Sequence, residues 1–500
     1  MPSDEGEIMP EALNVARPRD LFIGGEWTAP DGDGRFEVLN CSTGKVAATI
    51  AAAGPGDMER AVAAARRAFD QGPWPRMTHA ERAGYLRALA IELGARADDF
   101  ARIWSTESGI VNRLARARIG PLLTGAFGYY AGLADSFPFH ERHRSAGGTE
   151  ALLVREPVGV VAAIIPWNGP AGLMAYKCAP ALIAGCTLIV KSSPEAPCSA
   201  YILAEACAKI GLPPGVVNVV TADREVSELL VRHPGVDKVT FTGSTGAGRR
   251  IAAICGDRLA RCTLELGGKS PAVILDDYDV ETAARTIGAG VGYVTGQVCH
   301  SLTRIIVTAA RHDAMVDALS ATVGAMTVGD AFDPAVEVGP LANAAQRGRV
   351  EGYIAAGQRE GAVLAVGGRR PAHLDHGFFI EPTVFGHVDN RSTIGREEIF
   401  GPVLSVIAAR DEDHAIELAN DTPYGLNASL FTNDLDRFHA LARNIRAGTV
   451  GHNASRTDFS IAFGGVKQSG IGREGGVEGL LPFLEPKTVV SAVPWREEAG

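Results

Sequence analysis

Between residues 158 and 241 the sequence alternates short, uniformly apolar runs with segments of helical periodicity, and no other feature constrains the fold as strongly. Runs that are apolar at every position suit strands covered on both faces, and their alternation with helices indicates a parallel sheet with right-handed crossovers. We therefore predict an α/β domain of the dinucleotide-binding type. The predicted strands span 158–165, 187–190, 216–220 and 236–241, and the helices span 171–184, 200–210 and 225–231.

The rest of the chain extends this pattern. A chain of 500 residues with 46% hydrophobic content is too long for one simple core, so we expect two or three domains. Residues 57–134 carry apolar side chains at helical spacing, which predicts helices. A second α/β pattern predicts strands at 272–275 and 304–307 with a helix at 280–294 between them. At the two ends we expect a disordered tail over 1–20, a strand and hairpin-like region over 21–50, and a final strand at 488–493.

Charge and composition exclude several classes of function. A net charge of -10 leaves no basic face for nucleic acid or for an anionic membrane surface. Residues 1–20 lack the apolar core of a signal peptide. The most membrane-like segment, 171–190, contains Lys177 and Pro180, which is typical of a buried helix followed by a strand. We therefore expect a cytoplasmic protein with neither a membrane nor a nucleic acid as partner.

The cysteines and histidines form no metal-binding motif. The eight cysteines include no Cys-x-x-Cys pair and no dense cluster, which favours reduced thiols over disulfides or a zinc site. The stretch from His140 to His143 resembles the zinc-protease helix motif, but Arg144 stands where the second histidine would be needed. We predict no metal site.

Two glycine-containing segments were considered for phosphate binding. Residues 241–248 follow the fourth apolar run and open a helix, so their backbone amides could approach a pyrophosphate. Their spacing is not Gly-x-Gly-x-x-Gly, and a purely structural turn is the alternative. Gly268, Lys269 and Ser270 imitate the end of a P-loop, but Thr263 occupies the place of the required first glycine. We reject a P-loop there.

The candidates for chemistry are Cys299, in Gly-Gln-Val-Cys at 296–299, and Glu265, in Leu-Glu-Leu-Gly-Gly-Lys at 264–269. A thiolate is a strong nucleophile, and a positioned carboxylate can take a proton from water. Together the two side chains could form a thioester and then hydrolyse it. The other seven cysteines are expected to be small, buried, apolar side chains.

These motifs and several others, in the same order, resemble the NAD(P)-dependent aldehyde dehydrogenase superfamily over nearly the whole chain. The others are Phe-Ile-Gly-Gly-Glu-Trp at 22–27, Ile-Pro-Trp-Asn at 165–168, Phe-Thr-Gly-Ser-Thr at 241–245, Glu-Ile-Phe-Gly-Pro at 398–402 and the glycine loop at 463–476. The resemblance implies an α/β, aldehyde dehydrogenase-like fold assembled as a homodimer or homotetramer. Its implied parts are a Rossmann-type cofactor-binding domain (21–134 and 153–267), an α/β catalytic domain (268–467), and a small β oligomerisation domain with an arm (135–152) and a strand (480–496).

The resemblance also implies roles for individual residues. Cys299 would be the nucleophile, Glu265 the general base, and the Asn168 amide with the Cys299 backbone N–H the oxyanion hole. The implied reaction oxidises an aldehyde to the carboxylic acid through a thiohemiacetal and an acyl-thioester, with NAD(P) as hydride acceptor. The residues expected to bind the cofactor are Ile164, Pro166, Trp167, Lys191, Ser193, Glu195, Phe241, Gly243, Ser244, Glu398 and Phe400.

Three departures from the family pattern affect cofactor and substrate. Many members carry a glutamate three residues after the lysine at 191, whereas this chain has Pro194 there and Glu195 one place later. We expect NAD, because Glu195 keeps negative charge nearby, with NADP as the alternative. Small residues at 169–172 predict room for a bulky or branched apolar aldehyde. Ala462 replaces a common proline and 451–454 lack bulky side chains, which also alters the substrate tunnel.

Two alternative functions were weighed. A coenzyme A-acylating semialdehyde dehydrogenase would resolve the thioester with a thiol, whereas Glu265 is suited to activating water. A non-catalytic member of the fold should have lost the nucleophile or the base, and this chain retains both.

Overall fold

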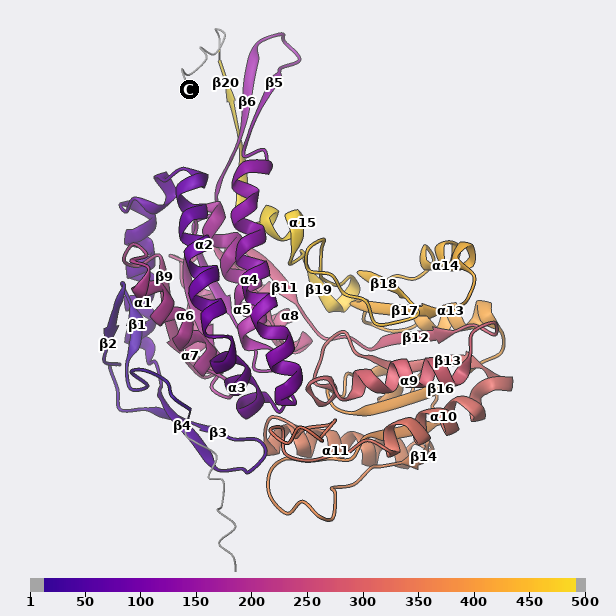
Figure 1. Ribbon diagram of the computed structural model, residues 1–500. Coiled ribbons are helices and arrows are strands. Elements are labelled where there is room, and N and C mark those ends of the chain that lie inside the picture. The colour runs from indigo at the N-terminus through magenta and orange to yellow at the C-terminus, as the bar shows by residue number, and fades with distance from the viewer. Residues whose placement is uncertain (1–12, 492–500) are drawn as a thin grey trace, which may run out of the picture.

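The computed structural model describes residues 13–491, which form two α/β lobes and a projecting β arm (Figure 1). The first lobe is built on an eight-stranded sheet of order β19-β11-β10-β7-β8-β9-β1-β2, in which β7 to β11 run parallel. Its strands are β1 (Leu21–Ile23), β2 (Glu26–Thr28), β7 (Val160–Ile164), β8 (Thr187–Ser192), β9 (Val217–Thr221), β10 (Lys238–Thr242), β11 (Arg261–Glu265) and β19 (Gly470–Ile471).

Helices cover both faces of this sheet, which confirms the expectation drawn from its uniformly apolar strands. Alternate residues of β7 belong to different cores, Val161 to the core under α2 to α6 and Ala162 to the core under α1, α7 and α8. The helices are α1 (Pro55–Asp70), α2 (His79–Ala95), α3 (Ala97–Ser108), α4 (Asn112–Ser136), α5 (Pro170–Ala184), α6 (Cys198–Lys209), α7 (Arg224–Arg232) and α8 (Thr245–Asp257).

The second lobe holds a seven-stranded sheet of order β14-β15-β16-β13-β12-β17-β18, parallel except for β14. Its strands are β12 (Ser270–Ile274), β13 (Leu302–Thr308), β14 (Val363–Val366), β15 (Thr383–Gly386), β16 (Val403–Ala409), β17 (Asn427–Phe431) and β18 (Thr449–His452). Its helices are α9 (Val280–Val291), α10 (His312–Gly324), α11 (Ala344–Arg359), α12 (Thr393–Arg396), α13 (Glu412–Asn420) and α14 (Leu435–Ala442). The predicted helix over 280–294 ends at Val291, because the backbone turns left-handed at Val294.

The arm is a three-stranded antiparallel sheet that projects from the first lobe (Figure 1). It contains β5 (His140–Arg144), β6 (Glu150–Pro157) and β20 (Leu484–Val490), and the short helix α15 (Gly476–Leu480) precedes β20. The final strand therefore lies earlier than the predicted 488–493, and the arm continues to Pro157 rather than ending at 152. Residues 492–496 of the expected strand lie outside the described part of the chain.

The expected disordered tail over 1–20 is wrong for its second part. Residues 13–20 pack against the hairpin of β3 (Arg35–Leu39) and β4 (Val46–Ala51), with Leu13 buried and its amide donating to the Ala47 carbonyl at 3.0 Å. The backbone pairing explains why a polar sequence is ordered there. Residues 1–12 lie outside the described part of the chain.

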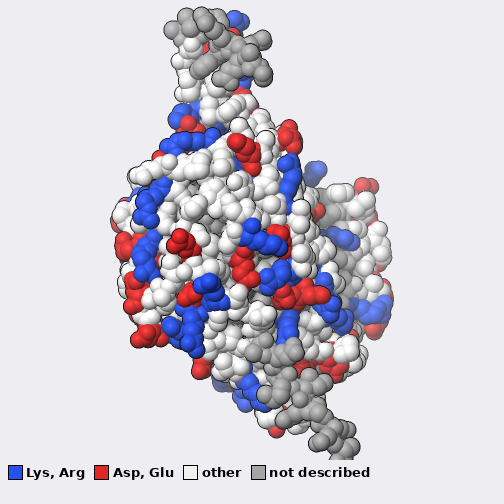
Figure 2. Space-filling model, turned by 60° about the vertical axis from the view of Figure 1, so that its left-hand side comes forward, with Lys and Arg blue, Asp and Glu red and all other residues white. Residues whose placement is uncertain are grey.

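Two further features of the fold are the charges of its surface and the hydrophobicity of its helices. The face drawn in Figure 2 mixes basic and acidic side chains without a continuous field of one sign. No helix within residues 13–491 is long and apolar enough to cross a bilayer.

The two lobes meet where the chain passes from β11 to β12. Glu265 is the last residue of β11 and Ser270 the first of β12, so only four residues cross between the sheets. Cys299 stands three residues before β13, which lies beside β12. The carboxyl edge of the first sheet therefore faces the amino edge of the second, and both candidate chemical groups lie at this junction.

Candidate active site

A left-handed turn positions Cys299. Three consecutive residues have positive φ: Val294 (47°), Thr295 (54°) and Gly296 (70°). This conformation is costly for two β-branched residues and persists only where surrounding contacts determine it. The Thr295 hydroxyl donates to the Gly339 carbonyl at 2.9 Å, and a Cβ on Gly296 would lie 2.5 Å from the Gly401 carbonyl oxygen. These contacts fix the backbone of the turn and therefore the position of Cys299, which follows it.

Gln297 fixes the same turn through its side chain. The Gln297 amide nitrogen donates to the Ser108 carbonyl at 3.1 Å, and its amide oxygen accepts from the Ala342 backbone at 2.9 Å. Its own backbone carbonyl accepts from the Asn168 side-chain nitrogen at 3.0 Å. Asn168 is anchored in turn, because its carbonyl accepts from the Trp104 indole at 2.8 Å. An amide donor is therefore held beside the nucleophile's loop.

Strand register brings the Glu265 segment to Cys299. Ser270 pairs with Leu302, so the residues just before each strand are neighbours. A Cβ on Gly268 would lie 2.5 Å from the Cys299 carbonyl oxygen, which only glycine permits. Glu265 is 2% exposed, and neither of its carboxyl oxygens has a hydrogen-bond partner within residues 13–491. A buried carboxyl group without partners is costly, so this group is held for something other than stability.

The surroundings of Glu265 raise its pKa. Burial and the nearby charge of Glu474 raise its pKa well above that of an ordinary glutamate, although Lys177 and Arg473 oppose them. Lys177 forms a buried ion pair with Glu474 and donates to the Thr242 hydroxyl at 2.7 Å. The buried Lys177–Glu474 ion pair therefore lies near the candidate base, and both of its charges act on the pKa of Glu265.

The Cys299 thiol is neutral at rest. Burial raises its pKa, and the charges of Glu398 and Glu265 raise it further, while backbone N–H groups of His300 and Cys299 oppose this. Burial likewise lowers the pKa of His300 to about 4, so its ring is uncharged. The nucleophile must therefore lose its proton during the reaction.

The strand order of the first sheet reverses at β7, which pairs with β8 on one side and with β10 on the other. From β7 the chain winds outward through β8 and β9, then returns to place β10 on the other side of β7. Such a switch point is where open α/β sheets bind ligands. Ile164 lies in register with Lys191 on β8 and with Phe241 on β10, so these three predicted cofactor residues form one row.

The residues at this switch point fit a dinucleotide. Lys191 is 7% exposed, and its ammonium group has no hydrogen bond or ion pair within residues 13–491; burial lowers its pKa to about 8. A Cβ on Gly243 would lie 2.5 Å from the Phe241 ring, so glycine lets the backbone pass close to it. Ser244 caps α8 and accepts from the Ala247 amide at 3.3 Å, and the helix N-terminus favours an anion.

Glu398 and Phe400 approach from the second lobe. The Glu398 carboxylate accepts from the Gly268 backbone amide at 3.1 Å, and burial raises its pKa to about 7. Phe400 has φ +61° and meets the Trp167 ring edge-on at 5.4 Å. Pro166 directly precedes Trp167 after β7, and Ser193 donates to Glu195 after β8. All predicted cofactor residues therefore lie along the two facing sheet edges.

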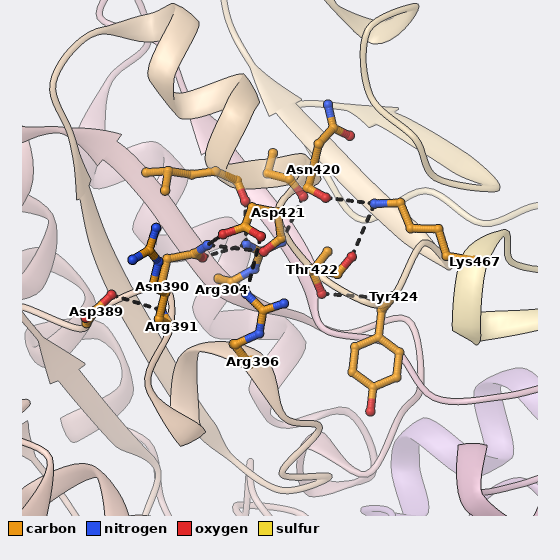
Figure 3. A network of polar contacts seen from close by, with 12 residues as sticks. Arg304, Asp389, Asn390, Arg391, Arg396, Asn420, Asp421, Thr422, Tyr424 and Lys467 are labelled. Carbon is orange, nitrogen blue, oxygen red and sulfur yellow. Dashed lines mark hydrogen bonds and ion pairs between the residues drawn. The ribbon is translucent and has the colours of Figure 1, made fainter.

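A buried arginine holds the amino edge of the second sheet (Figure 3). Arg304 of β13 is fully buried and donates to the Asn390 side chain at 2.8 Å and to the Leu418 and Ala419 carbonyls at 2.7 and 2.9 Å. It has no carboxylate partner within residues 13–491, and burial lowers its pKa to about 10. These bonds tie Arg304, five residues after Cys299, to the end of α13.

Several side chains near the site were not predicted from the sequence. Tyr176 stacks on Phe459 at 4.4 Å, Phe459 stacks on Phe463 at 4.3 Å, and Phe463 meets His300 edge-on at 5.8 Å. We call these four rings the aromatic row. A cavity of about 1110 Å³ lies beside it, lined by Val298 and His300, the two neighbours of Cys299, and by residues of α9 and of 448–458. The glycine loop at 463–476 was noted in the sequence, but nothing in it indicated the stack.

One group of possible metal ligands occurs within residues 13–491, at His312, Asp313 and His387. The His312 Nε2 atom accepts from the His387 backbone amide at 2.9 Å, so its proton is on Nδ1, which lies 2.8 Å from the Asp313 carboxylate. Neither ring nitrogen of His312 is then available as a ligand. The arrangement fits a hydrogen-bonded pair better than a metal centre.

The chain is similar to known proteins over most of its length. A sequence model of the aldehyde dehydrogenase family matches residues 27–489. The geranial dehydrogenase of Castellaniella defragrans is 46% identical over 469 residues, covering 94% of this chain and 98% of that protein. The betaine aldehyde dehydrogenase of Brucella melitensis is 40% identical over 471 residues, covering 94% and 96%.

Solved structures show the same fold. An aldehyde dehydrogenase from Mycobacterium tuberculosis in complex with NAD+ superposes with a TM-score of 0.93 at 43% identity, covering 96% of this chain and 99% of that one. A mutant of aldehyde dehydrogenase C from Pseudomonas syringae, in complex with NAD+ and octanal, gives 0.93 at 36% identity, covering 98% and 100%. The predicted fold class is therefore confirmed.

Proposed function

Since this chain belongs to the aldehyde dehydrogenase family, we propose that Cys299, Glu265 and Asn168 carry out its oxidation of an aldehyde to the carboxylic acid, with NAD as cofactor. The observation that carries the assignment of residues is the contact of the Glu265 segment, through Gly268, with the backbone of Cys299. This contact and the Asn168 bond to Gln297 support the proposed roles of nucleophile, base and amide donor.

The first step is attack by sulfur. The Cys299 thiolate adds to the aldehyde carbon, and the Asn168 side chain with the Cys299 N–H stabilises the oxyanion that develops. Asn168 is suited to this role because both its backbone and its side chain are held by hydrogen bonds. NAD held at the junction would supply the hydride acceptor, and the acyl group would then remain on the Cys299 sulfur.

Residues of both lobes would hold the cofactor. Lys191 supplies an unpaired buried cation for the adenosine ribose, and Gly243 and Ser244 present the start of α8 to the pyrophosphate. Glu398 and Phe400 would bind the nicotinamide ribose and position the ring. The proposed cofactor residues of the two lobes lie on opposite sheet edges, and the junction at Cys299 lies between these edges.

The second step is hydrolysis of the acyl group. Glu265 takes a proton from water, which then attacks the thioester and releases the acid. Its unpaired carboxyl oxygens leave hydrogen-bonding capacity for that water, and Gly464 leaves space, since a Cβ there would lie 2.4 Å from a Glu265 oxygen. The same feature argues against a coenzyme A-acylating enzyme, which would not require this base. Added coenzyme A should yield no acyl-coenzyme A.

We propose that the cofactor preference is for NAD over NADP. Glu195 lies close enough to Lys191 for its charge to oppose the lowering of the lysine pKa. That carboxylate would repel a 2'-phosphate on the adenosine ribose. We expect the KM for NADP to exceed that for NAD by about tenfold, equivalent to about 1.4 kcal/mol. Steady-state assays of the native chain and Glu195→Gln test this; an equal ratio in both, or a lower KM for NADP, would refute the role of Glu195.

The substrate proposed is a bulky or branched apolar aldehyde, but the original reason needs correction. The space expected at Gly172 is occupied, because a Cβ there would lie 3.2 Å from both methyl groups of Leu122. Leu173 likewise stands 3.8 Å from the place of a Cβ on Gly169. The space beside Gly169 and Gly172 is therefore filled by apolar side chains rather than empty. The support now comes from these leucines and from the aromatic row that ends beside Cys299.

Removing one ring of the aromatic row should change specificity. In Phe459→Ala we expect kcat/KM for a branched ten-carbon aldehyde to fall about tenfold to a hundredfold, the equivalent of one buried phenyl ring, with little change for acetaldehyde. Phe69→Ala is the matched control, because its part-buried ring lies on α1, under the Arg66 guanidinium and against the core under α1, α7 and α8. Assays with acetaldehyde, the branched aldehyde and a trimethylammonium aldehyde decide the matter. Preference for either small or cationic substrate in the native chain would contradict an apolar specificity.

We propose that the chain assembles as a homodimer or homotetramer in the cytoplasm, with the parts divided as the family resemblance implies. Both β5 and β20 are edge strands of the arm, and exposed Val490 lies on the latter. Open strand edges are surfaces that pair readily with another chain. Residues 468–479 belong to none of these proposed parts. They return to the first lobe, where β19 pairs with β11.

A further inference from the structure

Cys255 and Cys262 lie at either end of the turn that joins α8 to β11. The turn is closed by a hydrogen bond of 2.9 Å from the Ala260 amide to the Cys255 carbonyl. Both side chains pack into the core beneath α8, where each thiol influences the pKa of the other. Neighbouring sulfurs on an ordered turn provide the geometric condition for a disulfide.

One of the two thiols is open to small solutes. Cys262 is half-buried, whereas Cys255 is 1% exposed. The reason lies in the sheet: on one side Cys262 pairs with Val239 of β10, but on the other side β19 covers only Leu264 and Glu265. At Cys262 the first sheet therefore has a free edge.

The charges around the pair favour a thiolate on Cys262. The neighbouring Cys255 thiol lowers the pKa of Cys262, and the positive charge of Lys238 on the adjacent strand lowers it further. Lys238 is buried, donates to the Thr263 hydroxyl at 2.7 Å and has no ion pair within residues 13–491. The pKa of Cys255 is raised by the neighbouring Cys262 thiol and by burial. The other six cysteines, Cys299 included, all have raised pKa values.

We propose that Cys255 and Cys262 are a redox modification site, at which hydrogen peroxide forms a reversible disulfide distinct from the catalytic thiol. Reactive redox cysteines combine thiolate character, access and a nearby resolving thiol, and this pair has all three. The disulfide would join α8, which begins at the Gly243 turn, to β11, which ends at Glu265.

The chemistry balances with peroxide as the oxidant. The Cys262 sulfur attacks one peroxide oxygen, the O–O bond breaks, and a sulfenic acid and one water result once the protons are counted. The Cys255 sulfur then attacks the Cys262 sulfur, an S–S bond forms, and the hydroxyl leaves with the proton of Cys255 as a second water. Two thiols lose two electrons in total, and one peroxide is reduced to two waters.

Peptide mapping tests the proposal directly. In full-length protein carrying Cys299→Ser, peroxide treatment, alkylation under denaturing conditions and trypsin should give peptide 251–258 linked to peptide 262–269, lighter by two hydrogens than their sum. A reducing agent should restore both peptides. During peroxide treatment, the fraction of Cys262 that can still be alkylated should fall at least about tenfold faster than that of buried Cys178. With Cys255→Ser, a sulfenic acid at Cys262 should be trapped by a dione reagent.

Two results would overturn the proposal. In the first, the alkylatable fraction of Cys262 falls no faster than that of Cys178. In the second, it becomes a sulfinic acid while Cys255 stays free. Because the readout is a peptide mass in a protein without the catalytic thiol, neither result depends on the assigned enzyme activity.

Discussion

Replacement of Cys299 by alanine should lower kcat by about 10⁴-fold or more, because it removes the sulfur that is proposed to carry the acyl group. Binding of NAD should persist with an affinity within about twofold, since the residues proposed to hold it lie on strand ends that do not depend on the thiol. Reduced nicotinamide absorbance measures turnover, and fluorescence titration measures binding.

Cys262→Ser is the matched control for that substitution. It removes another half-buried thiol from β11 without touching the Cys299 loop, so turnover should stay close to the native value. If Cys299→Ala kept a substantial fraction of native turnover, the nucleophile would have to be another group. Loss of NAD binding in the alanine variant would instead indicate that the turn at 294–297 had collapsed.

In Glu265→Gln we expect steady-state turnover to fall by about 10²- to 10⁴-fold, the range that a general base contributes. The amide cannot take a proton from water, so acyl transfer to water slows while acylation of Cys299 continues. Rapid-mixing absorbance should therefore show a burst of reduced cofactor close to one equivalent per active site, followed by slow turnover. A variant with no burst would place Glu265 in the acylation step, and one with native turnover would remove it from catalysis.

The native enzyme should show the same base in its pH profile. Because burial and Glu474 raise the pKa of Glu265, the deprotonated form that acts as base is present only above a value higher than an ordinary glutamate's. Steady-state kcat should consequently rise with pH through that raised value and fall below it. In Glu265→Gln this limb should disappear from the slow phase.

The first sheet could be predicted from the sequence because its strands are apolar on both faces. Residues 158–165 read as one run, and the structure places β7 within it, with alternate side chains in two different cores. Lys177 was correctly placed in a buried helix, since an ammonium group within an apolar segment argues against a bilayer. What periodicity could not indicate was its partner, Glu474, which follows almost three hundred residues later.

The details of the site depend on contacts between distant segments, and no local pattern encodes these. The predicted helix over 280–294 stops early because the Thr295 hydroxyl and the Gly296 backbone are fixed by residues 339 and 401. The room expected at Gly172 is filled by Leu122 of α4, whose arrival depends on helix packing. Likewise, the proximity of Glu265 and Cys299 follows from the register of β12 on β13, and was anticipated only through the family resemblance.

The most direct test of the account is the mass of the covalent intermediate. Glu265→Gln should be mixed with a branched apolar aldehyde and NAD, quenched in acid during the slow phase and digested with trypsin. The acyl group should be found on peptide 286–304, on the Cys299 sulfur, at close to one per chain. Reduced cofactor formed without any acylated peptide, or an acyl group on a peptide that lacks Cys299, would contradict the account.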